Sequence, residues 1–186
     1  MLEKLLAILF RDKNLSGNSS KWANWMSKLT IFTCKYCVEQ HGKIVDISVL
    51  ENQFQVLAHP KCQCVYVAMR TKAAGTATNL RYNGADAYLI YLKKLPDYYI
   101  TKKEARQLGW SDWKGNLNKV LPNKMIGGDE YKNREGRLPD KAGRVWYEAD
   151  INYDGGYRNQ QRVLFSNDGL VFVSYDHYQT FFEITR

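Results

Sequence analysis

The chain has 186 residues, with 27 basic against 19 acidic side chains, and its formal charge of +8 indicates a polyanionic partner such as nucleic acid. This length is enough for one compact domain with its own core and a smaller module beside it. Its 13% aromatic content excludes a disordered polycation, and no apolar run reaches the ~20 residues of a membrane span.

The first ten residues, MLEKLLAILF, predict an amphipathic helix with Leu2, Leu5, Leu6 and Leu9 on one side. A secretory signal peptide is not evident, because the apolar stretch is short, its flank is acidic and no small-x-small cleavage site follows.

All four cysteines lie before residue 65, where Cys34-x-x-Cys37 is followed by His59 and then Cys62-x-Cys64. Thiolates and an imidazole this close in sequence are typical of structural zinc sites, so zinc held by these four cysteines, or with the histidine, is one interpretation. The spacing of the second pair is not that of a zinc ribbon. Disulfide bonds and free thiols are the alternatives that the sequence leaves open.

Residues 71–79, TKAAGTATN, are small and polar without periodicity, which is typical of a linker. We therefore expect a Cys-rich module over residues 1–70, a linker over 71–80 and a second domain over 81–186. The first 78 residues hold 10 basic and 5 acidic side chains, whereas the rest hold 17 and 14. The second domain must therefore concentrate a few cations in one place if it binds a polyanion.

Apolar residues at helical spacing predict a helix over about 82–93, and Pro96 follows its end. Thr101 and Glu104 have the spacing of a capping box at the start of a second short helix. A third short helix is expected over about 116–121.

From residue 145 the apolar pattern has period two. Turn signals around residues 154–156 and 167–169 separate expected strands, which cover about 144–151, 157–166, 170–173 and 179–184. Helices followed by antiparallel strands predict an α+β fold, with the helices packed on an antiparallel sheet.

Pairing the first two of these strands around residue 154 places Arg162 opposite Glu148 and puts Asp150 and Arg158 on the same face. A solvated charged face is the ordinary explanation, and a lone histidine such as His177 is more often incidental than catalytic. The same residue types also fit RNA cleavage without a metal. That reaction needs a base for the 2′-hydroxyl proton, an acid for the departing 5′-oxygen and cations for the phosphorus oxygens.

Long motifs in this half resemble the barnase family of guanyl-preferring ribonucleases over about residues 79–186. They are LPDYYITKKEARQLGW (95–110), KGNL (114–117), IGGD (126–129), NREGRLP (133–139), GRVWYEADINY (143–153), GYRN (156–159) and DHYQTF (176–181). The resemblance implies the microbial ribonuclease fold and an endoribonuclease that cleaves single-stranded RNA, preferentially after guanine. Cleavage would pass through a 2′,3′-cyclic phosphate and need no cofactor.

The resemblance also implies the catalytic residues. Glu148 matches the general base and His177 matches the general acid. The cations around the scissile phosphate are matched by Lys102, Arg158 and Arg162. We expect Asp150 to orient the two arginines and Asp129 to orient the lysine.

Four further positions match substrate-binding residues of the family. Asn133 and Glu135 match residues that recognise the base, a form of recognition that works best on unpaired RNA. Arg134 matches a residue at the edge of the phosphate site, and Tyr178 matches an aromatic residue that packs near the bound base.

Residues 30–68, with TCKYCVEQHGKIV and HPKCQCVYV, resemble phage Mu F-like minor head proteins, segments of which precede nuclease modules in polymorphic toxins. This implies a secreted or delivered toxin that acts on RNA in the cytoplasm of a target cell. The resemblance to the barnase family implies an acidic barstar-like inhibitor or immunity protein as a partner, since an active ribonuclease is lethal to its maker. The alternatives are a phage structural protein with an incidental nuclease module and a metal-dependent nuclease.

Overall fold

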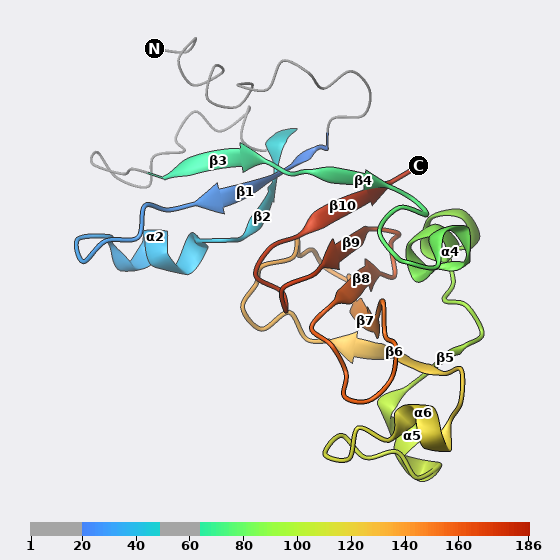
Figure 1. Ribbon diagram of the computed structural model, residues 1–186. Coiled ribbons are helices and arrows are strands. Elements are labelled where there is room, and N and C mark those ends of the chain that lie inside the picture. The colour runs from blue at the N-terminus through green and yellow to red at the C-terminus, as the bar shows by residue number, and fades with distance from the viewer. Residues whose placement is uncertain (1–19, 49–63) are drawn as a thin grey trace. The chain divides into compact units, whose positions relative to one another are not determined.

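The computed structural model describes residues 20–48 and 64–186, which form two compact units (Figure 1). One unit consists of residues up to Arg70 together with Asn133–Lys141, and the other of Thr71–Lys132 together with Ala142–Arg186. The helix expected over residues 1–10 lies outside the described residues. Within those described ranges, no helix is long and apolar enough to cross a membrane.

The first unit contains a three-stranded antiparallel sheet in the order β2-β1-β3, built from Trp22–Met26 (β1), Ile44–Asp46 (β2) and Val65–Ala68 (β3). Helix α2 (Lys35–Gln40) begins after Cys34, whose sulfur accepts a hydrogen bond from the backbone N–H of Cys37. The buried apolar side chains of this unit include Trp22, Ala23, Trp25, Cys37, Ile44, Met69 and Leu138.

The second unit contains a seven-stranded sheet in the order β4-β10-β9-β8-β7-β6-β5. Its strands are β4 (Thr71–Ala73), β5 (Tyr99–Ile100), β6 (Met125–Tyr131), β7 (Trp146–Asp150), β8 (Arg162–Ser166), β9 (Val171–Ser174) and β10 (Phe182–Thr185). The two outermost pairs are parallel and all others are antiparallel. This mixed sheet with short helices confirms the α+β prediction.

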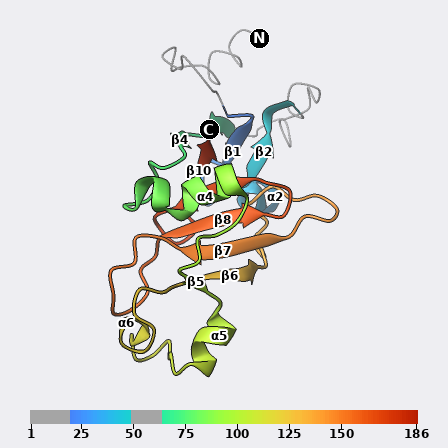
Figure 2. The same cartoon turned by 90° about the vertical axis from the view of Figure 1, so that its right-hand side faces the viewer.

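The helices of this unit are η1 (Arg81–Asn83), α4 (Ala85–Leu92), α5 (Lys102–Gln107) and α6 (Leu117–Val120). Helix α4 packs across β8, β9 and β10 (Figure 2), where Leu89 and Ile90 join Val163 and Val173 in one apolar core. Both hydrogen bonds of the predicted capping box at the start of α5 are present.

Residues 71–80, for which composition indicates a linker, belong to the second unit. β4 pairs with β10, and Ala74 and Ala77 are buried in the core with α4. The fully buried carboxylate of Asp86 accepts hydrogen bonds from the N–H groups of Gly75 (2.8 Å) and Ala77 (3.0 Å). Small residues permit this close packing, but local composition does not reveal a strand partner more than 100 residues away.

The β7–β8 register differs from the prediction. Arg162 lies opposite Asp150, and Glu148 lies opposite Leu164. Strand β8 starts only at Arg162, because the side-chain amide of Asn159 donates to the carbonyls of residues 151 and 152 (both 2.9 Å) and holds the preceding chain in a loop. Glu148, Asp150 and Arg162 share one sheet face as predicted despite the shift, because they remain in phase, whereas Arg158 lies in the loop before β8 and not on the sheet.

We expect Asp86→Ala to lower the free energy of unfolding by about 2–4 kcal/mol, because it leaves buried N–H groups without their acceptor. Urea unfolding followed by circular dichroism measures this. Asp97→Ala is the matched control, because that side chain is 99% exposed, and it should change stability by less than about 0.5 kcal/mol. Equal effects of the two substitutions would contradict the role of Asp86.

Candidate active site

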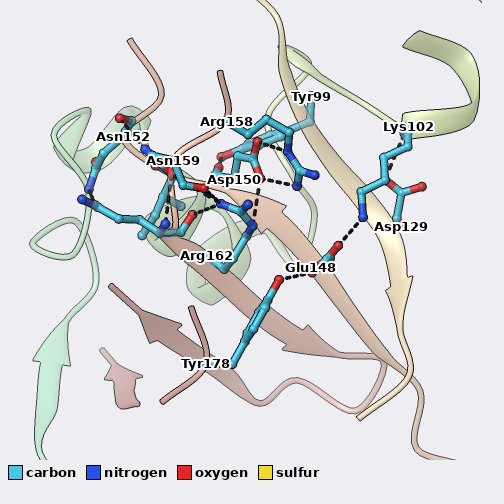
Figure 3. Close-up of polar contacts among 12 residues, drawn as sticks. Tyr99, Lys102, Asp129, Glu148, Asp150, Asn152, Arg158, Asn159, Arg162 and Tyr178 are labelled. Carbon is cyan, nitrogen blue, oxygen red and sulfur yellow. Dashed lines mark hydrogen bonds and ion pairs between the residues drawn. The ribbon is translucent and has the colours of Figure 1, made fainter. Parts of the chain in front are cut away.

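A buried carboxylate lies at the centre of the polar face of the sheet. Glu148, on β7, is only 8% exposed. Its Oε1 lies 2.5 Å from Nζ of Lys102, and its Oε2 accepts a hydrogen bond from the hydroxyl of Tyr178 (Figure 3). Two donors from distant parts of the chain therefore hold both oxygens of one carboxylate.

These contacts set the charge state of the carboxylate. Burial alone would raise the pKa of Glu148, but hydrogen bonds from Lys102 and Tyr178, with the charges of Lys102 and Arg158, bring that pKa below its ordinary value. Burial, and to a lesser extent the neighbouring carboxylate of Glu148, raises the pKa of Tyr178. The phenol therefore stays protonated and donates a hydrogen bond to Glu148. Glu148 is therefore ionised at neutral pH and able to accept a proton.

Lys102 is positioned by the start of α5. Thr101 caps this helix, and the backbone N–H of Lys102 donates to Oδ2 of Asp129 at 2.9 Å. Asp129 follows a β-bulge in which Gly128 has a φ of +91°, so that Asp129 pairs with Glu148 on the next strand. The carboxylate of Asp129 thus binds the backbone N–H of Lys102 and not the ammonium group of that lysine.

Two arginines converge on one buried carboxylate. Asp150 is fully buried and accepts two hydrogen bonds from Arg158, at 2.7 and 2.6 Å. Nε of Arg162 lies 3.1 Å from Oδ1 of Asp150, an ion pair that is not aligned as a hydrogen bond. Burial works against the charge of Arg158, but the bonds to Asp150 outweigh this and raise its pKa. Asp150 thus holds Arg158 by the expected pair of hydrogen bonds, whereas it contacts Arg162 as an ion pair only.

Asn159 is a supporting residue that the sequence analysis missed. Its backbone carbonyl accepts a hydrogen bond from Nη1 of Arg162 at 2.7 Å. Its side-chain amide holds the loop that carries Arg158, through hydrogen bonds to the carbonyls of residues 151 and 152. The signal was an asparagine in a segment with weak strand periodicity, where a side-chain amide can replace ladder hydrogen bonds.

His177 lies in the loop between β9 and β10, and its side chain is exposed. His177 and Tyr178 have φ values of +57° and +70°, a left-handed conformation that costs bulky residues free energy. The backbone N–H of Tyr178 donates a hydrogen bond to Oγ of Ser174 at 2.8 Å. The ring centroids of His177 and Tyr178 lie 4.8 Å apart. The loop therefore holds an accessible imidazole next to the phenol that contacts Glu148.

Asp176 stabilises this loop and was also missed. It accepts hydrogen bonds from the backbone N–H (2.9 Å) and hydroxyl (2.6 Å) of Thr180 and from the hydroxyl of Ser174 (2.9 Å). Burial would raise the pKa of Asp176, but these bonds outweigh it and lower the pKa. The sequence signal was an aspartate just before a chain reversal, where it can accept N–H groups a few residues on.

The three remaining candidate residues lie in the loop of the first unit. Asn133 closes this loop, because its side chain donates to the carbonyl of Leu138 (2.9 Å) and accepts from its N–H (3.1 Å). The carboxylate of Glu135 lies 3.0 Å from Nε of Arg137 and is 70% exposed, and Arg134 is exposed as well.

The structure describes only Cys34, Cys37 and Cys64 of the predicted zinc site, so that site stays a prediction. Oγ of Ser27 donates to the carbonyl of Cys37 at 2.5 Å and lies 3.3 Å from the sulfur of Cys64. Within residues 20–48 and 64–186, no group of three or more His, Cys, Asp and Glu side chains is placed to hold a metal ion. His59 and Cys62, which the zinc interpretation requires, lie outside these ranges.

Comparison with known proteins assigns a family to this arrangement. A family model described as ribonuclease matches residues 84–185. The ribonuclease of Heyndrickxia coagulans is 54% identical over 103 residues, which cover 55% of this chain and 94% of that protein. Ribonucleases of Bacillus intermedius and Bacillus pumilus are also 54% identical over 103 residues, and the match covers 64% of each.

We expect Tyr178→Phe to raise the pKa of Glu148, because it removes one hydrogen bond to the ionised carboxylate and leaves the burial unchanged. The measurement is an NMR titration of the ¹³C-labelled side-chain carboxyl. Tyr147→Phe is the control, because Tyr147 neighbours Glu148 on β7 but stacks on Phe165 instead. A Glu148 pKa unchanged in Tyr178→Phe would contradict the assigned contact.

Proposed function

This chain belongs to the ribonuclease family, and we propose that it cleaves single-stranded RNA preferentially after guanine. Endoribonuclease activity follows from the family. The observation that carries the proposed cleavage of RNA is the ionised, buried Glu148 in contact with Lys102, next to two arginines fixed on Asp150. This combination offers a proton acceptor and several cations to a phosphodiester.

In the proposed first step, Glu148 takes the proton of the 2′-hydroxyl. The 2′-oxygen forms a bond to phosphorus, the bond from phosphorus to the 5′-oxygen breaks, and His177 gives a proton to the departing oxygen. The products are a 2′,3′-cyclic phosphate and a free 5′-hydroxyl.

Lys102, Arg158 and Arg162 are proposed to stabilise negative charge on the phosphorus oxygens in the transition state. An entering phosphate also competes with Glu148 for the ammonium of Lys102. Because that contact lowers the pKa of Glu148, its loss to the phosphate makes the carboxylate a stronger base when substrate is bound. Substrate binding therefore prepares the base for the reaction.

The second step reverses the proton transfers. His177, now neutral, takes a proton from water, whose oxygen bonds to phosphorus. The bond from phosphorus to the 2′-oxygen breaks, and Glu148 returns its proton to that oxygen, leaving a 3′-phosphate. Ribonucleases of this family need no metal ion for catalysis, and in both steps a protein side chain carries each proton.

Base preference is assigned to the loop Asn133–Lys141. Asn133 holds the loop closed, and the 70% exposed carboxylate of Glu135 on this loop is accessible to a base. Guanine presents N–H donors on its Watson–Crick edge, and a carboxylate is an acceptor for them. Tyr178 is proposed to pack near the same base.

We further propose that the chain is a secreted or delivered toxin whose maker is protected by an acidic, barstar-like inhibitor. Three cations arranged for a phosphate present a positive surface that acidic side chains can neutralise, as the barnase–barstar pair illustrates. The resemblance of residues 30–68 to a segment that precedes nuclease modules in toxins supports this role.

We expect Glu148→Gln and His177→Ala each to lower RNA cleavage by about 10²–10⁴-fold, because each removes one proton-transfer group. The assay uses single-stranded RNA with and without EDTA and identifies cyclic-phosphate ends. Glu130→Gln is the control, since this carboxylate on β6 pairs with Lys132 at the surface, and it should retain activity. Full activity of a folded His177→Ala protein would contradict the mechanism, and loss of cleavage with EDTA would favour a metal-dependent nuclease.

Expression of the full chain inside bacteria should stop growth, whereas expression of the Glu148→Gln variant should not. Co-expression of an acidic barstar-like protein should restore growth. Plating efficiency under induction measures both effects. Equal toxicity of the two chains would show that RNA cleavage is not the cause of growth arrest, and would contradict the toxin role.

A further inference from the structure

The loop Asn133–Lys141 closes the edge of the first unit's sheet. Among the residues that the structure describes, strand β2 is an edge strand that pairs with β1 on one side only. On its other side, the N–H of Ile44 donates to the carbonyl of Arg137 at 2.8 Å. An edge strand has backbone groups that require a partner, and here the loop supplies one.

The two segments approach each other closely on either side of this bond. A Cβ atom on Gly42 would lie 3.9 Å from the guanidinium carbon of Arg137, and one on Gly136 would lie 3.7 Å from Cε of Lys43. Ile44 and Leu138 are both almost fully buried. Residues 42–44 and 136–138 are therefore packed against one another within one compact unit.

Inside the loop, contacts connect this edge to the residues assigned to base recognition. Arg137, whose carbonyl is bound by Ile44, pairs through Nε with the carboxylate of Glu135 at 3.0 Å. Leu138, the next residue, exchanges two hydrogen bonds with the side chain of Asn133. A shift of Arg137 away from β2 would therefore displace the carboxylate of Glu135.

We propose that residues 42–44 of the N-terminal unit are positioning residues for guanine selection. They hold Arg137 through the backbone of Ile44, and Arg137 in turn orients Glu135. This inference rests on the proposed function, in which Glu135 recognises guanine. The N-terminal unit is then a determinant of base specificity rather than only a carrier of the nuclease.

The bond can be removed without disturbing the β1–β2 pair. The hydrogen bonds between these strands near Ile44 use the carbonyl of Lys43 and the N–H of Gly42, both with Trp25. Of the backbone hydrogen-bonding groups, Ile44→Pro removes the N–H that faces Arg137, and an edge strand accepts proline at such a position. Ile44→Ala is the matched control, because it shortens the same buried side chain and keeps the N–H.

The test measures kcat and KM of the full chain for the dinucleotides GpU and ApU. We expect Ile44→Pro to reduce the ratio of kcat/KM for GpU over ApU by about three- to tenfold relative to Ile44→Ala, the factor of one net hydrogen bond. The loss should appear in KM for GpU, with kcat nearly unchanged. Equal ratios in the two variants would overturn the inference.

A second measurement on the unaltered chain keeps the inference falsifiable if the proline variant does not fold. Hydrogen exchange is followed with and without guanosine 3′-monophosphate. Slower exchange at the amide of Ile44 when the nucleotide is bound supports the coupling. Binding that protects the loop but not Ile44 overturns the positioning role alone, whereas no binding at all overturns guanine recognition and the inference with it.

Discussion

The ion pairs of Asp150 with Arg158 and Arg162 are the interaction on which the second unit's polar face depends. Two guanidinium groups that share one region repel each other, and a carboxylate shielded from water is costly without partners. When the two guanidinium groups lie around the carboxylate, their attraction to it offsets both their mutual repulsion and the cost of its burial. The hydroxyl of Tyr99 also donates to the backbone carbonyl of Asp150, so the same residue is held at main chain and side chain. Loss of this carboxylate would leave the buried Arg162 and the partly buried Arg158 without their shared anionic partner.

The balance of charge around this carboxylate matches a phosphodiester. Three cations, Lys102, Arg158 and Arg162, lie with two carboxylates, Glu148 and Asp150, which leaves one net positive charge in this group of five (Figure 3). One backbone phosphate carries one negative charge. In the proposed mechanism, the arginines stay paired with Asp150 throughout, while Lys102 exchanges Glu148 for substrate. The arginines are thus a fixed electrostatic environment, and the lysine is the part that responds.

Local sequence was sufficient where local chemistry decides structure. The capping box of Thr101 and Glu104, the α+β class and the pairing of Asp150 with its arginines were predictable, because each follows from spacing or charge. The register of β7 and β8 was not, since the side chain of Asn159 rather than a tight turn decides where β8 begins. Strand β4 was also missed, because its partner β10 lies at the other end of the chain and nothing in TKAAGTATN encodes that contact.

The first unit is discontinuous in sequence, and this has a consequence during synthesis. Its sheet comes from the first 70 residues, but the loop that covers β2 follows β6 and emerges only after more than 60 further residues. A nascent chain therefore exposes the edge of β2 until residue 137 has left the ribosome, and at that point β7 to β10 have not yet emerged. Since Glu148 and His177 emerge later still, the N-terminal unit can be completed before the proposed catalytic centre exists. The order of synthesis itself would then delay activity until His177 has emerged.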